Sequence, residues 1–524
     1  MADVVVGSFA ELRVALQNAT APTTIYLSND ITISSGITVP KTAGSIIIDG
    51  LYPLDGTGTI HSITDYNSGN SADTINVTAV SGAFDMTLQN LTFIGRNYYG
   101  MFYVQESPLN ADITLTIKNV VYTGPQPIYN RNGITHIIDS NFTVDALNGT
   151  VCPVQEFGEV NSLILEGKVS VINNTNSSAC LWFANQIPVF QIMPNAEISI
   201  SVPNNYFIFA DNPVRISFGA NSSTIISTNT GMFYNADSNR HIASTVLIDT
   251  ASSVTISQNV RNSGVPTIRI QTALTVNENA SLYVATKFTP ADAILQFTQG
   301  ATINFNNPRS VVLYNLGGNV FNFPSVSSTV NVNAYLVAIW AVATSFPNAG
   351  GLDDVPLHAW QKGDNSIITV TATAAGSTTQ NVTSNITTGD SGGAMDTATF
   401  DIANADVLSF GNLPLSLDEF DKEAVVITGS TVPNANVRAA YSGTVATGVA
   451  DTGGNISLPL DVSVPITAPL TFKSNLVFLT NTITITKING VDFTHLAKTL
   501  PFNDIAVPSN TAIIKRADSD WYME

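Results

Sequence analysis

Short apolar segments separated by polar turns dominate the first two-thirds of the chain. Between residues 190 and 305, five segments share one order: a strand-like run, a polar turn, an alanine and a second strand-like run. Their alanines are separated by 24, 31, 29 and 21 residues, and they are Ala196, Ala220, Ala251, Ala280 and Ala301. Repetition at this period predicts a solenoid, in which each repeat adds one layer of strands.

The kind of solenoid follows from what the repeats lack. Leucine-rich repeats need regularly spaced leucines, and propeller blades need a longer and more regular period. What remains is a three-faced parallel β-helix, in which side chains alternate between a stacked interior and the solvent. We therefore predict an all-β chain whose residues 1–345 form a right-handed parallel β-helix (solenoid) of roughly a dozen coils.

A short amphipathic helix is predicted over residues 8–19, ahead of the first strands. A serine and a glutamate three residues apart have the spacing of a capping box, and a phenylalanine and two leucines fall on one helical face. Because the first coil of a solenoid otherwise exposes its core and strand edges, we expect this helix to form a structural cap. The residues of the predicted cap are Ser8, Phe9, Glu11, Leu12 and Leu16.

The pattern changes after Trp340. Turn and breaker residues follow, and residues 346–420 are rich in Thr, Ser, Gly and Ala, which predicts a small β-rich junction module. Short strands with closely spaced turns predict a β-sandwich over residues 421–487. Residues 488–524 then form a tail.

The opening residues resemble a known family. Phe9-Ala-Glu-Leu12, Thr24-Ile-Tyr-Leu27 and Ile46-Ile-Ile-Asp-Gly50 follow one another as in the pectate-lyase-like adhesive domain of Gram-positive bacterial surface proteins. The resemblance covers about residues 7–345. It implies a parallel β-helix similar in fold to pectate lyases, with an adhesive role.

Two weaker resemblances lie further along the chain. Residues 423–487 resemble bacterial immunoglobulin-like (Ig-like) modules. The matching elements are Ile427-Thr-Gly429, Val432-Pro-Asn-Ala-Asn-Val437 and Asp451-Thr-Gly-Gly-Asn455. The tail, with Val491-Asp-Phe493 and Arg516-Ala-Asp-Ser-Asp-Trp521, resembles the start of a WxL-type wall-binding domain, but no Trp-x-Leu follows. Either the sequence is truncated at its C-terminus or this last similarity is accidental.

Charge narrows the range of partners. With 39 acidic and 20 basic residues, the chain has a net charge of −19, which disfavours nucleic acid and anionic membrane surfaces. The longest apolar stretch, Ala334–Ala343, is about half the length that crosses a bilayer, so we expect no membrane insertion. The N-terminus carries no leader, and we expect a signal peptide to have been removed. Within these limits, the resemblance to the adhesive domain implies a secreted, cell-wall-associated adhesin or structural spacer, with a host or bacterial surface glycan or protein as its partner.

A polysaccharide lyase or hydrolase acting on acidic glycans in a β-helix groove is the alternative. A calcium-dependent lyase needs acidic residues around the cation and an arginine as proton acceptor. His136-Ile-Ile-Asp139 is the nearest match to the lyase motif, and Asn229-Thr-Gly231 lacks the aspartate of the hydrolase element. We therefore predict no enzyme, no catalytic residue, no metal site and no cofactor; calcium would suit a β-helix, but the sequence does not indicate it.

One pentapeptide, Gly389-Asp-Ser-Gly-Gly393, has the letters of the trypsin-type nucleophile motif. That chemistry also requires a histidine base oriented by a buried carboxylate. The segment is rich in turn-forming residues and has no such histidine setting upstream, so we interpret it as a loop.

Aromatic residues provide the candidate binding site. Arg96, Tyr98 and Tyr99 lie in a predicted loop, where the rings would stack on a sugar or a protein surface. Other rings that would serve this purpose are Phe102, Tyr103, Trp182, Tyr206, Phe207 and Tyr314. Cys152 and Cys180 are about one coil apart in sequence. They are either two buried thiols or one disulfide between coils.

Overall fold

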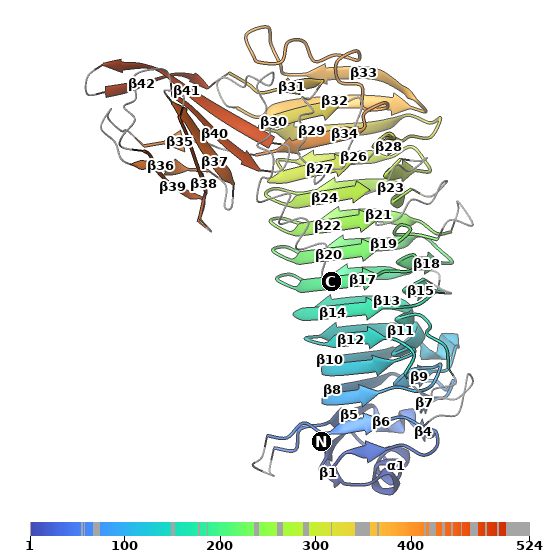
Figure 1. The fold of residues 1–524 in the computed structure, drawn as a ribbon. Coiled ribbons are helices and arrows are strands. Elements are labelled where there is room, and N and C mark those ends of the chain that lie inside the picture. The colour runs from blue at the N-terminus through green and yellow to red at the C-terminus, as the bar shows by residue number, and fades with distance from the viewer. Residues whose placement is uncertain are drawn as a thin grey trace. The chain divides into compact units, whose positions relative to one another are not determined.

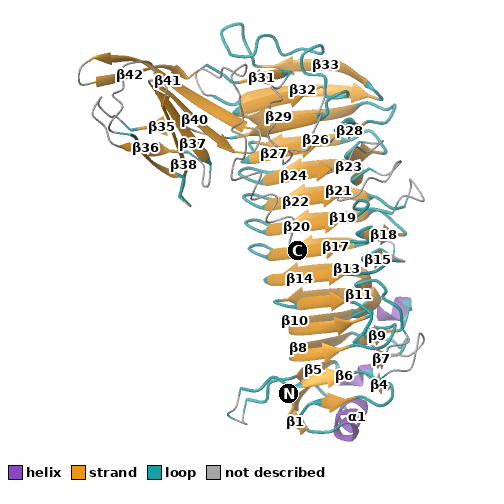
Figure 2. Cartoon of the chain, viewed as in Figure 1, coloured by secondary structure: helices purple, strands orange, loops and turns teal. Residues whose placement is uncertain are grey.

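The computed structural model comprises two compact units, unit 1 (Met1–Leu274) and unit 2 (Thr275–Glu524). It describes residues 2–53, 56, 58–66, 74–147, 152–176, 179–185, 187–234, 240–258, 266–286, 293–315, 317–340, 357–363, 366–412, 416–418, 426–431, 435–441, 444–451, 453–461, 470–476, 479–489 and 492–498. The described residues are almost entirely strand, turn and loop (Figure 2). The prediction of an all-β chain containing a parallel β-solenoid is confirmed, with about 10 turns rather than a dozen. Its right-handedness stays a prediction.

Unit 1 has three faces, each a column of parallel strands. Face A contains β1 (Ala2–Val6), β2 (Thr23–Leu27), β5 (Ser45–Asp49), β16 (Val189–Ile192), β19 (Val214–Phe218), β21 (Ala243–Ile248) and β23 (Ile268–Val276). Face B contains β3 (Ile31–Thr32), β6 (Ser62–Thr64), β12 (Asn141–Val144), β14 (Lys168–Asn173), β17 (Glu197–Val202), β20 (Ser223–Thr228) and β22 (Ser253–Gln258). Face C contains β4 (Ile37–Val39), β7 (Ile75–Val77), β9 (Phe102–Val104), β15 (Leu181–Phe183) and β18 (Ile208–Ala210).

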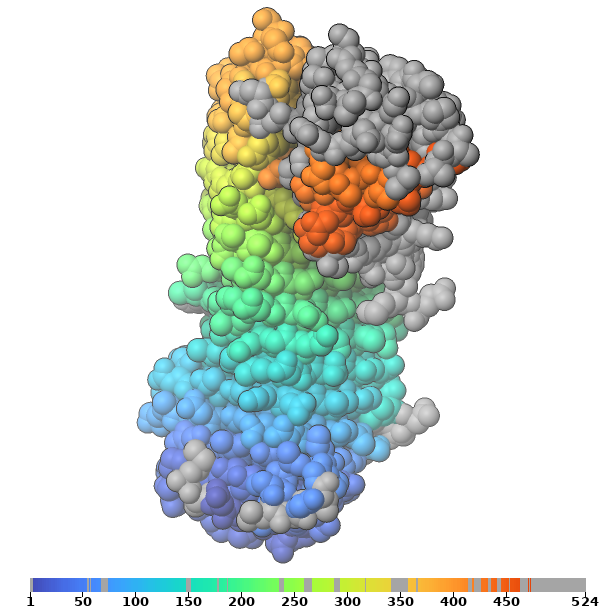
Figure 3. Space-filling view, turned by 90° about the vertical axis from the view of Figure 1, so that its left-hand side faces the viewer, coloured from blue at the N-terminus to red at the C-terminus, as the bar shows by residue number. Residues whose placement is uncertain are grey.

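Four long strands each run through two faces. β8 (Phe84–Ile94) and β10 (Ile113–Gly124) pass from face A to face B, whereas β11 (Ile128–Ile138) and β13 (Gly158–Glu166) pass from face C to face A. In Figure 1 the strands of unit 1 rise one above another, and the space-filling view shows successive coils in direct contact from blue to green (Figure 3).

The interior of unit 1 is built by strand alternation. Every second side chain points inward, and the register of face A stacks these residues into one continuous buried column. Its members are Ile25, Ile48, Leu88, Ile117, Ile137, Leu165, Ile192, Phe218 and Ile248. Each such side chain contributes about 1.5–3 kcal/mol of burial free energy, so the column favours parallel stacking over any slipped register.

The corner between faces A and B is a left-handed backbone turn. In unit 1 a residue with positive φ occupies this corner in coil after coil, and these residues are Asn90, Asn119, Asp139, Gly167, Asn195, Asn221 and Ala251. Asparagine and glycine tolerate this conformation best. A Cβ added at Gly167 would lie 2.1 Å from Oδ1 of Asp139, so only glycine fits there.

The alanines of the sequence repeat mark this corner. Ala196 follows Asn195, Ala220 precedes Asn221, and Ala251 is itself the corner residue. In unit 2, Ala280 likewise follows Asn279, which has a φ of 57°. Ala301 is different: it precedes β26 (Thr302–Asn306), and the left-handed residue of that coil is Asn307. The fifth predicted repeat is therefore out of phase with the other four.

The predicted N-terminal helix is present as α1 (Phe9–Gln17). The Oγ of Ser8 accepts from the amide of Glu11 at 3.4 Å, and the Glu11 carboxylate accepts from the amide of Gly7 at 2.8 Å. Leu12 and Leu16 are fully buried, and the helix packs against β1 and β4. None of the described helices is long and apolar enough to cross a membrane.

Unit 2 changes from parallel to antiparallel pairing. β24 (Ser281–Thr286), β25 (Leu295–Phe297) and β26 pair in parallel with β27 (Ser310–Tyr314), β28 (Phe321–Asn322) and β29 (Ser328–Ala334). The strands that follow are β30 (Leu336–Trp340), β31 (His358–Trp360), β32 (Ile368–Ala375), β33 (Thr378–Ser384) and β34 (Val407–Gly411). They pair antiparallel with one another and with β27 and β29. The strands of the predicted junction module thus extend sheets that begin before residue 345, and its boundaries stay a prediction.

The last described part of unit 2 contains two antiparallel sheets. One consists of β35 (Ser416–Leu417), β36 (Val426–Ser430) and β39 (Asn455–Pro459), and the other of β37 (Asn436–Tyr441), β38 (Thr444–Val449), β40 (Leu470–Leu476), β41 (Leu479–Asn489) and β42 (Asp492–Lys498). Both sheets contribute to one buried core, with Ile427 and Leu458 from the first sheet and Val437 and Phe472 from the second. Its Ig-like identity stays a prediction, and the predicted wall-binding element at Arg516–Trp521 lies outside the described residues.

Candidate ligand-binding surface

The predicted binding residues lie in the loop between β8 and β9. Tyr98 and Tyr99 are half-buried and meet edge to face, with ring centroids 5.0 Å apart. The ring of Tyr99 also lies 4.5 Å from that of Tyr103 and 5.0 Å from that of Tyr129. Arg96 is half-buried in the same loop, but among the described residues its side chain makes no ring contact and no ion pair. The structure therefore brings the two tyrosines, but not Arg96, into one cluster.

This cluster continues along face C as a column of outward-facing side chains. In β9, β15 and β18 the first and third residues are buried and the middle one faces outward. The strand register places Tyr103 beside Tyr129, then Glu159, Trp182 and Phe209 in successive coils. A bridge between Ile208 and Phe233 places Tyr234 next to Phe209. The six rings, which we call the aromatic strip, are Tyr99, Tyr103, Tyr129, Trp182, Phe209 and Tyr234.

Neighbouring rings of the aromatic strip are in contact. Centroid separations are 4.9 Å for Tyr103–Tyr129, 5.4 Å for Trp182–Phe209 and 5.3 Å for Phe209–Tyr234. Such ring pairs add about 0.5–1.5 kcal/mol beyond their buried area. Apart from Tyr129, the rings are half-buried or exposed, so an edge or a face of each remains open to solvent.

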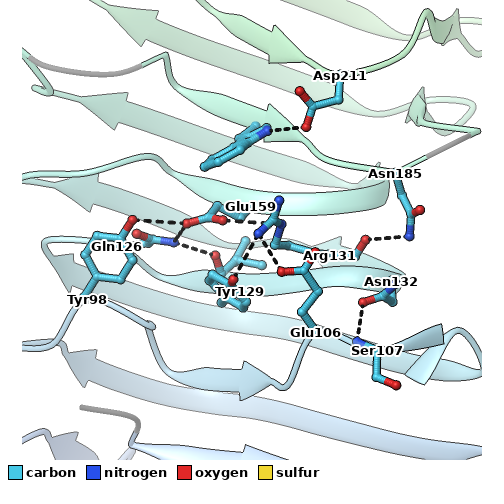
Figure 4. A network of polar contacts seen from close by, with 12 residues as sticks. Tyr98, Glu106, Ser107, Gln126, Tyr129, Arg131, Asn132, Glu159, Asn185 and Asp211 are labelled. Atoms are coloured by element: carbon cyan, nitrogen blue, oxygen red, sulfur yellow. Dashed lines mark hydrogen bonds and ion pairs between the residues drawn. The ribbon is translucent and has the colours of Figure 1, made fainter. Parts of the chain in front are cut away.

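Arg131 joins the two halves of the aromatic strip. Its guanidinium carbon lies 4.6 Å from the centroid of the Trp182 ring, within the range of a cation–π contact. Nη1 is 2.8 Å from Oε2 of Glu106 and donates to the hydroxyl of Tyr129 at 3.4 Å, while Nε lies 3.6 Å from Oε2 of Glu159 (Figure 4). Between Tyr129 and Trp182 the column has a carboxylate, Glu159, in place of a ring. The planar guanidinium of Arg131 bridges this gap, so planar groups continue along the coil axis.

Glu159 is the buried partner that holds Arg131. Burial raises its pKa to about 7, with a further increase from Glu156 and an opposing effect of Arg131. Its Oε1 accepts from the hydroxyl of Tyr98 and from Nε2 of Gln126, both at 3.5 Å (Figure 4). Because its side chain is only 2% exposed, this carboxyl has no access to a bound ligand and acts as a positioning group.

Polar side chains line both sides of the strip. Trp182 donates from Nε1 to Oδ2 of Asp211 at 3.1 Å, and Asp211 also lies 3.8 Å from Arg240. Asn185 donates to the carbonyl of Arg131, and Asn132 accepts from the amide of Ser107. Figure 4 shows these groups gathered around Arg131 from separate coils. The indole and the guanidinium are thereby fixed before any ligand arrives.

The sequence matches to enzyme motifs have structural roles. Nε2 of His136 lies 2.8 Å from Glu166, and Oδ1 of Asp139 accepts the amide of Lys168 at the A–B corner. In the pentapeptide, Asp390 pairs with Lys362 at 3.1 Å, and Ser391 donates to a backbone carbonyl. Backbone amides lower the pKa of Asp390. Within the described residues there is also no group of three or more His, Cys, Asp or Glu that would hold a metal ion.

The two cysteines lie under the surface of unit 1. Cys152 and Cys180 are both buried free thiols in the structure. Burial raises the pKa of Cys152 to about 11 and raises that of Cys180 further. Neither thiol is activated as a nucleophile, because reactive cysteines have a lowered pKa.

Comparison with known proteins identifies one matching family. Residues 3–129 match the model of a family described as "Putative pectate lyase-like adhesive domain", which covers less than half of the chain. The resemblance found in the opening residues is confirmed over this range, and the range includes Tyr99, Tyr103 and Tyr129. No curated protein matches the chain at a significant level.

Among solved structures, L. reuteri 53608 SRRP is similar to this chain. It is 17% identical, and the match covers 58% of this chain and 97% of that chain with a TM-score of 0.34. A TM-score this low supports no argument about this chain.

Proposed function

We propose that the chain is a non-catalytic surface adhesin or spacer of a Gram-positive bacterium, and that unit 1 binds its ligand on face C. The aromatic strip carries this proposal. Rings at outward-facing positions of neighbouring coils, with Arg131 and the buried Glu159 behind them, form a preorganised contact surface. The match of residues 3–129 to an adhesive family supports it, because three rings of the strip lie in that range.

The carboxylates near the strip support binding rather than catalysis. Glu106 and Glu159 pair with Arg131, and Asp211 accepts from Trp182. Lyases and hydrolases need a carboxylate or an arginine free to act on the substrate. These groups instead hold one another in place.

The remaining parts of the chain fit the same proposal. We infer that α1 caps the first coil, that the two antiparallel sheets around Ile427 and Phe472 form an Ig-like module that adds reach, and that the protein is secreted and attached to the cell wall. A host or bacterial surface glycan or protein is the partner, and no cofactor is needed.

The proposal is tested with the purified 524-residue chain. Adhesion to host epithelial cells, to bacterial cells and to a mixed glycan panel is measured beside release of cleaved product. We expect retention without cleavage, and loss of retention in Trp182→Ala and Tyr99→Ala. Tyr52→Ala is the matched control, since Tyr52 packs against Tyr26 in unit 1 with ring centroids 5.8 Å apart, outside the strip. Turnover of a glycan, or retention that survives both strip variants, would refute the proposal.

A further inference from the structure

We infer that the ligand of the aromatic strip is an extended glycan chain without acidic groups, lying along the coil axis of face C. This inference rests on the proposed function and names the class of ligand. It follows from the spacing of the rings, from the polar groups between them and from the charge around them.

The spacing of the strip suits a polymer. Tyr103, Tyr129, Trp182, Phe209 and Tyr234 occupy separate coils, and Glu159 occupies the coil between the second and third of them. Neighbouring strands lie about 4.8 Å apart, so the strip extends roughly 24 Å over five steps. Each step is comparable to the length that one pyranose adds to an extended chain. A single sugar would use one ring, whereas a chain would use several.

The chemistry of the strip suits sugars. A pyranose has an apolar C–H face and a rim of hydroxyl groups, so it needs a ring to stack on and polar groups beside that ring. Trp182 and Phe209 provide stacking surfaces. Beside Trp182 lie the guanidinium of Arg131, 4.6 Å from the ring centroid, and the side chain of Asn185, which donates to the carbonyl of Arg131 (Figure 4). Because Asp211 and Glu159 already hold the indole and the guanidinium, binding would require little side-chain ordering.

The charge around the strip disfavours acidic glycans. Glu106 is 55% exposed at its side chain and Asp211 is 29% exposed, and both lie at the edge of the strip. The guanidinium of Arg131 is only 16% exposed and is shared between Glu106 and Glu159. Arg240 lies beside Asp211 at 3.8 Å. Glu106 and Asp211 thus offset the positive charges of Arg131 and Arg240, and the net charge of −19 would repel a polyanion.

The test is a titration of the whole chain with matched oligosaccharides. Neutral β-1,4-linked gluco-, manno- and xylo-oligosaccharides of increasing length are compared with oligogalacturonates of the same lengths, by calorimetry at low and high salt. We expect at least one neutral series to bind, with affinity that rises with chain length up to the span of the strip and changes little with salt. Trp182→Ala and Phe209→Ala should each weaken that binding about tenfold, and Tyr52→Ala should leave it unchanged.

A charge variant tests the selectivity. Glu106→Gln removes one of the two partners of Arg131 and one negative charge, so it should gain measurable, salt-sensitive affinity for oligogalacturonate and keep its affinity for the neutral chain. Tighter binding of oligogalacturonate than of every neutral series by the unmodified chain would overturn the inference. So would strip-dependent adhesion to cells that persists after their glycans are removed, which would leave the proposed adhesive function standing. Adhesion that is independent of the strip would defeat the proposed function itself.

Discussion

Faces B and C of unit 1 are built by the same coils, yet their outer surfaces differ in kind. On face B one row of outward positions in register is short and polar except for one isoleucine: Ser170 lies beside Ser199, which is followed by Ile225 and Thr255. On face C the equivalent positions are occupied by the rings of the aromatic strip. The inward positions are mostly apolar on both faces, although face B also buries Asn173, Thr224 and Thr228. The two faces therefore share the way their interior is built and differ in the side chains that they present outward.

Strand length separates the two faces as well. β14, β17, β20 and β22 on face B have six residues each, whereas β9, β15 and β18 on face C have three. Shorter strands leave more of each coil as loop, and loops carry binding residues because they tolerate change. Tyr98, Tyr99 and Glu106 all reach the strip from loops on either side of β9.

Both faces depend on α1 to cap the first coil. Disrupting this cap should have the largest effect on the unfolding free energy. Leu12→Asp places a charge where the side chain is fully buried, and it also removes apolar packing. We expect unit 1 to lose more than about 4 kcal/mol of unfolding free energy, measured by urea denaturation. Val14→Asp, on the exposed side of the same helix, is the control. An unchanged midpoint for Leu12→Asp would mean that α1 does not protect the first coil.

Inward residues of the two faces should be equally important. Phe183→Ala on face C and Ile200→Ala on face B both create a cavity, since each side chain is at most 2% exposed. We expect losses of about 3–5 and 2–5 kcal/mol, respectively, in urea denaturation. A loss under 1 kcal/mol for Phe183→Ala alone would show that face C is loosely packed and would end the comparison.

The buried carboxyl behind the strip makes the stability of face C depend on pH. Its pKa of about 7, against 4.5 for a free glutamate, means that the folded state retains a proton that the unfolded state loses. The contribution of this group to stability is therefore most favourable below pH 4.5 and decreases by about 3 kcal/mol as the pH rises to 7. Asp65, whose pKa burial raises to about 6, acts in the same direction.

Glu159→Gln isolates the contribution of face C to this pH dependence. The variant has an uncharged side chain of similar shape. Its stability should therefore decrease much less as the pH rises, and the remaining decrease should come from Asp65. Urea midpoints of both proteins between pH 4.5 and 8 provide the measurement. Parallel curves for the two proteins would argue against a protonated Glu159.

The corner between faces A and B should show a smaller effect. Asn119→Ala removes the side-chain amide that lets asparagine tolerate a φ of 52°, and with it the hydrogen bond that Asn119 donates to Oδ1 of Asn90 at 2.9 Å. We expect a loss of about 2 kcal/mol. Asn119→Gly keeps the conformation accessible and should lose about 1 kcal/mol. Equal thermal midpoints for the two variants would show that backbone conformation is not what asparagine provides here.

Substitutions on the outer surfaces of faces B and C should have the smallest effect on stability, but they should differ in their effect on adhesion. Ser199→Ala on face B should change the unfolding free energy by less than about 0.5 kcal/mol and leave adhesion unchanged. Tyr103→Ala on face C should leave the circular dichroism spectrum intact but weaken adhesion. Surface plasmon resonance on the best glycan of the panel compares the two variants. Equal adhesion by both would remove the functional distinction between the faces.

The sequence predicts the interior of unit 1 better than it predicts the outer surface. The repeat around Ala196 and Ala251 predicted parallel coils, because backbone geometry and interior stacking constrain every coil in the same way. The left-handed corner residues carry the stronger signal, since their spacing of 20–30 residues continues through unit 1 from Asn90 to Ala251. The sequence alone does not reveal this signal, because the corner residues are of four types (Asn, Asp, Gly and Ala) and only their conformation sets them apart.

The candidate site was predicted only in part. Tyr98 and Tyr99 were identified from local composition, and Tyr103 and Trp182 were noted as rings, but Arg131 and Glu159 were not. They lie 28 residues apart in sequence and meet only because the Tyr129–Glu159 register aligns their coils. Arg96, which is adjacent to the tyrosines in sequence, takes no part in the cluster. Pairing across coils depends on the length of each loop, and composition does not determine that length.

The left-handed corner also makes each coil a removable unit. Asn195 and Asn221 have φ values of 63° and 59°, so the chain enters and leaves the intervening coil with nearly the same backbone conformation. Deleting one corner-to-corner segment would join two strands that already point in the same direction, and duplicating it would add another layer. The height of the solenoid can therefore change in steps of about 4.8 Å without redesigning its cross-section. If the proposed attachment to the cell wall holds, the distance between the wall and the binding surface would change by one such step with each coil gained or lost.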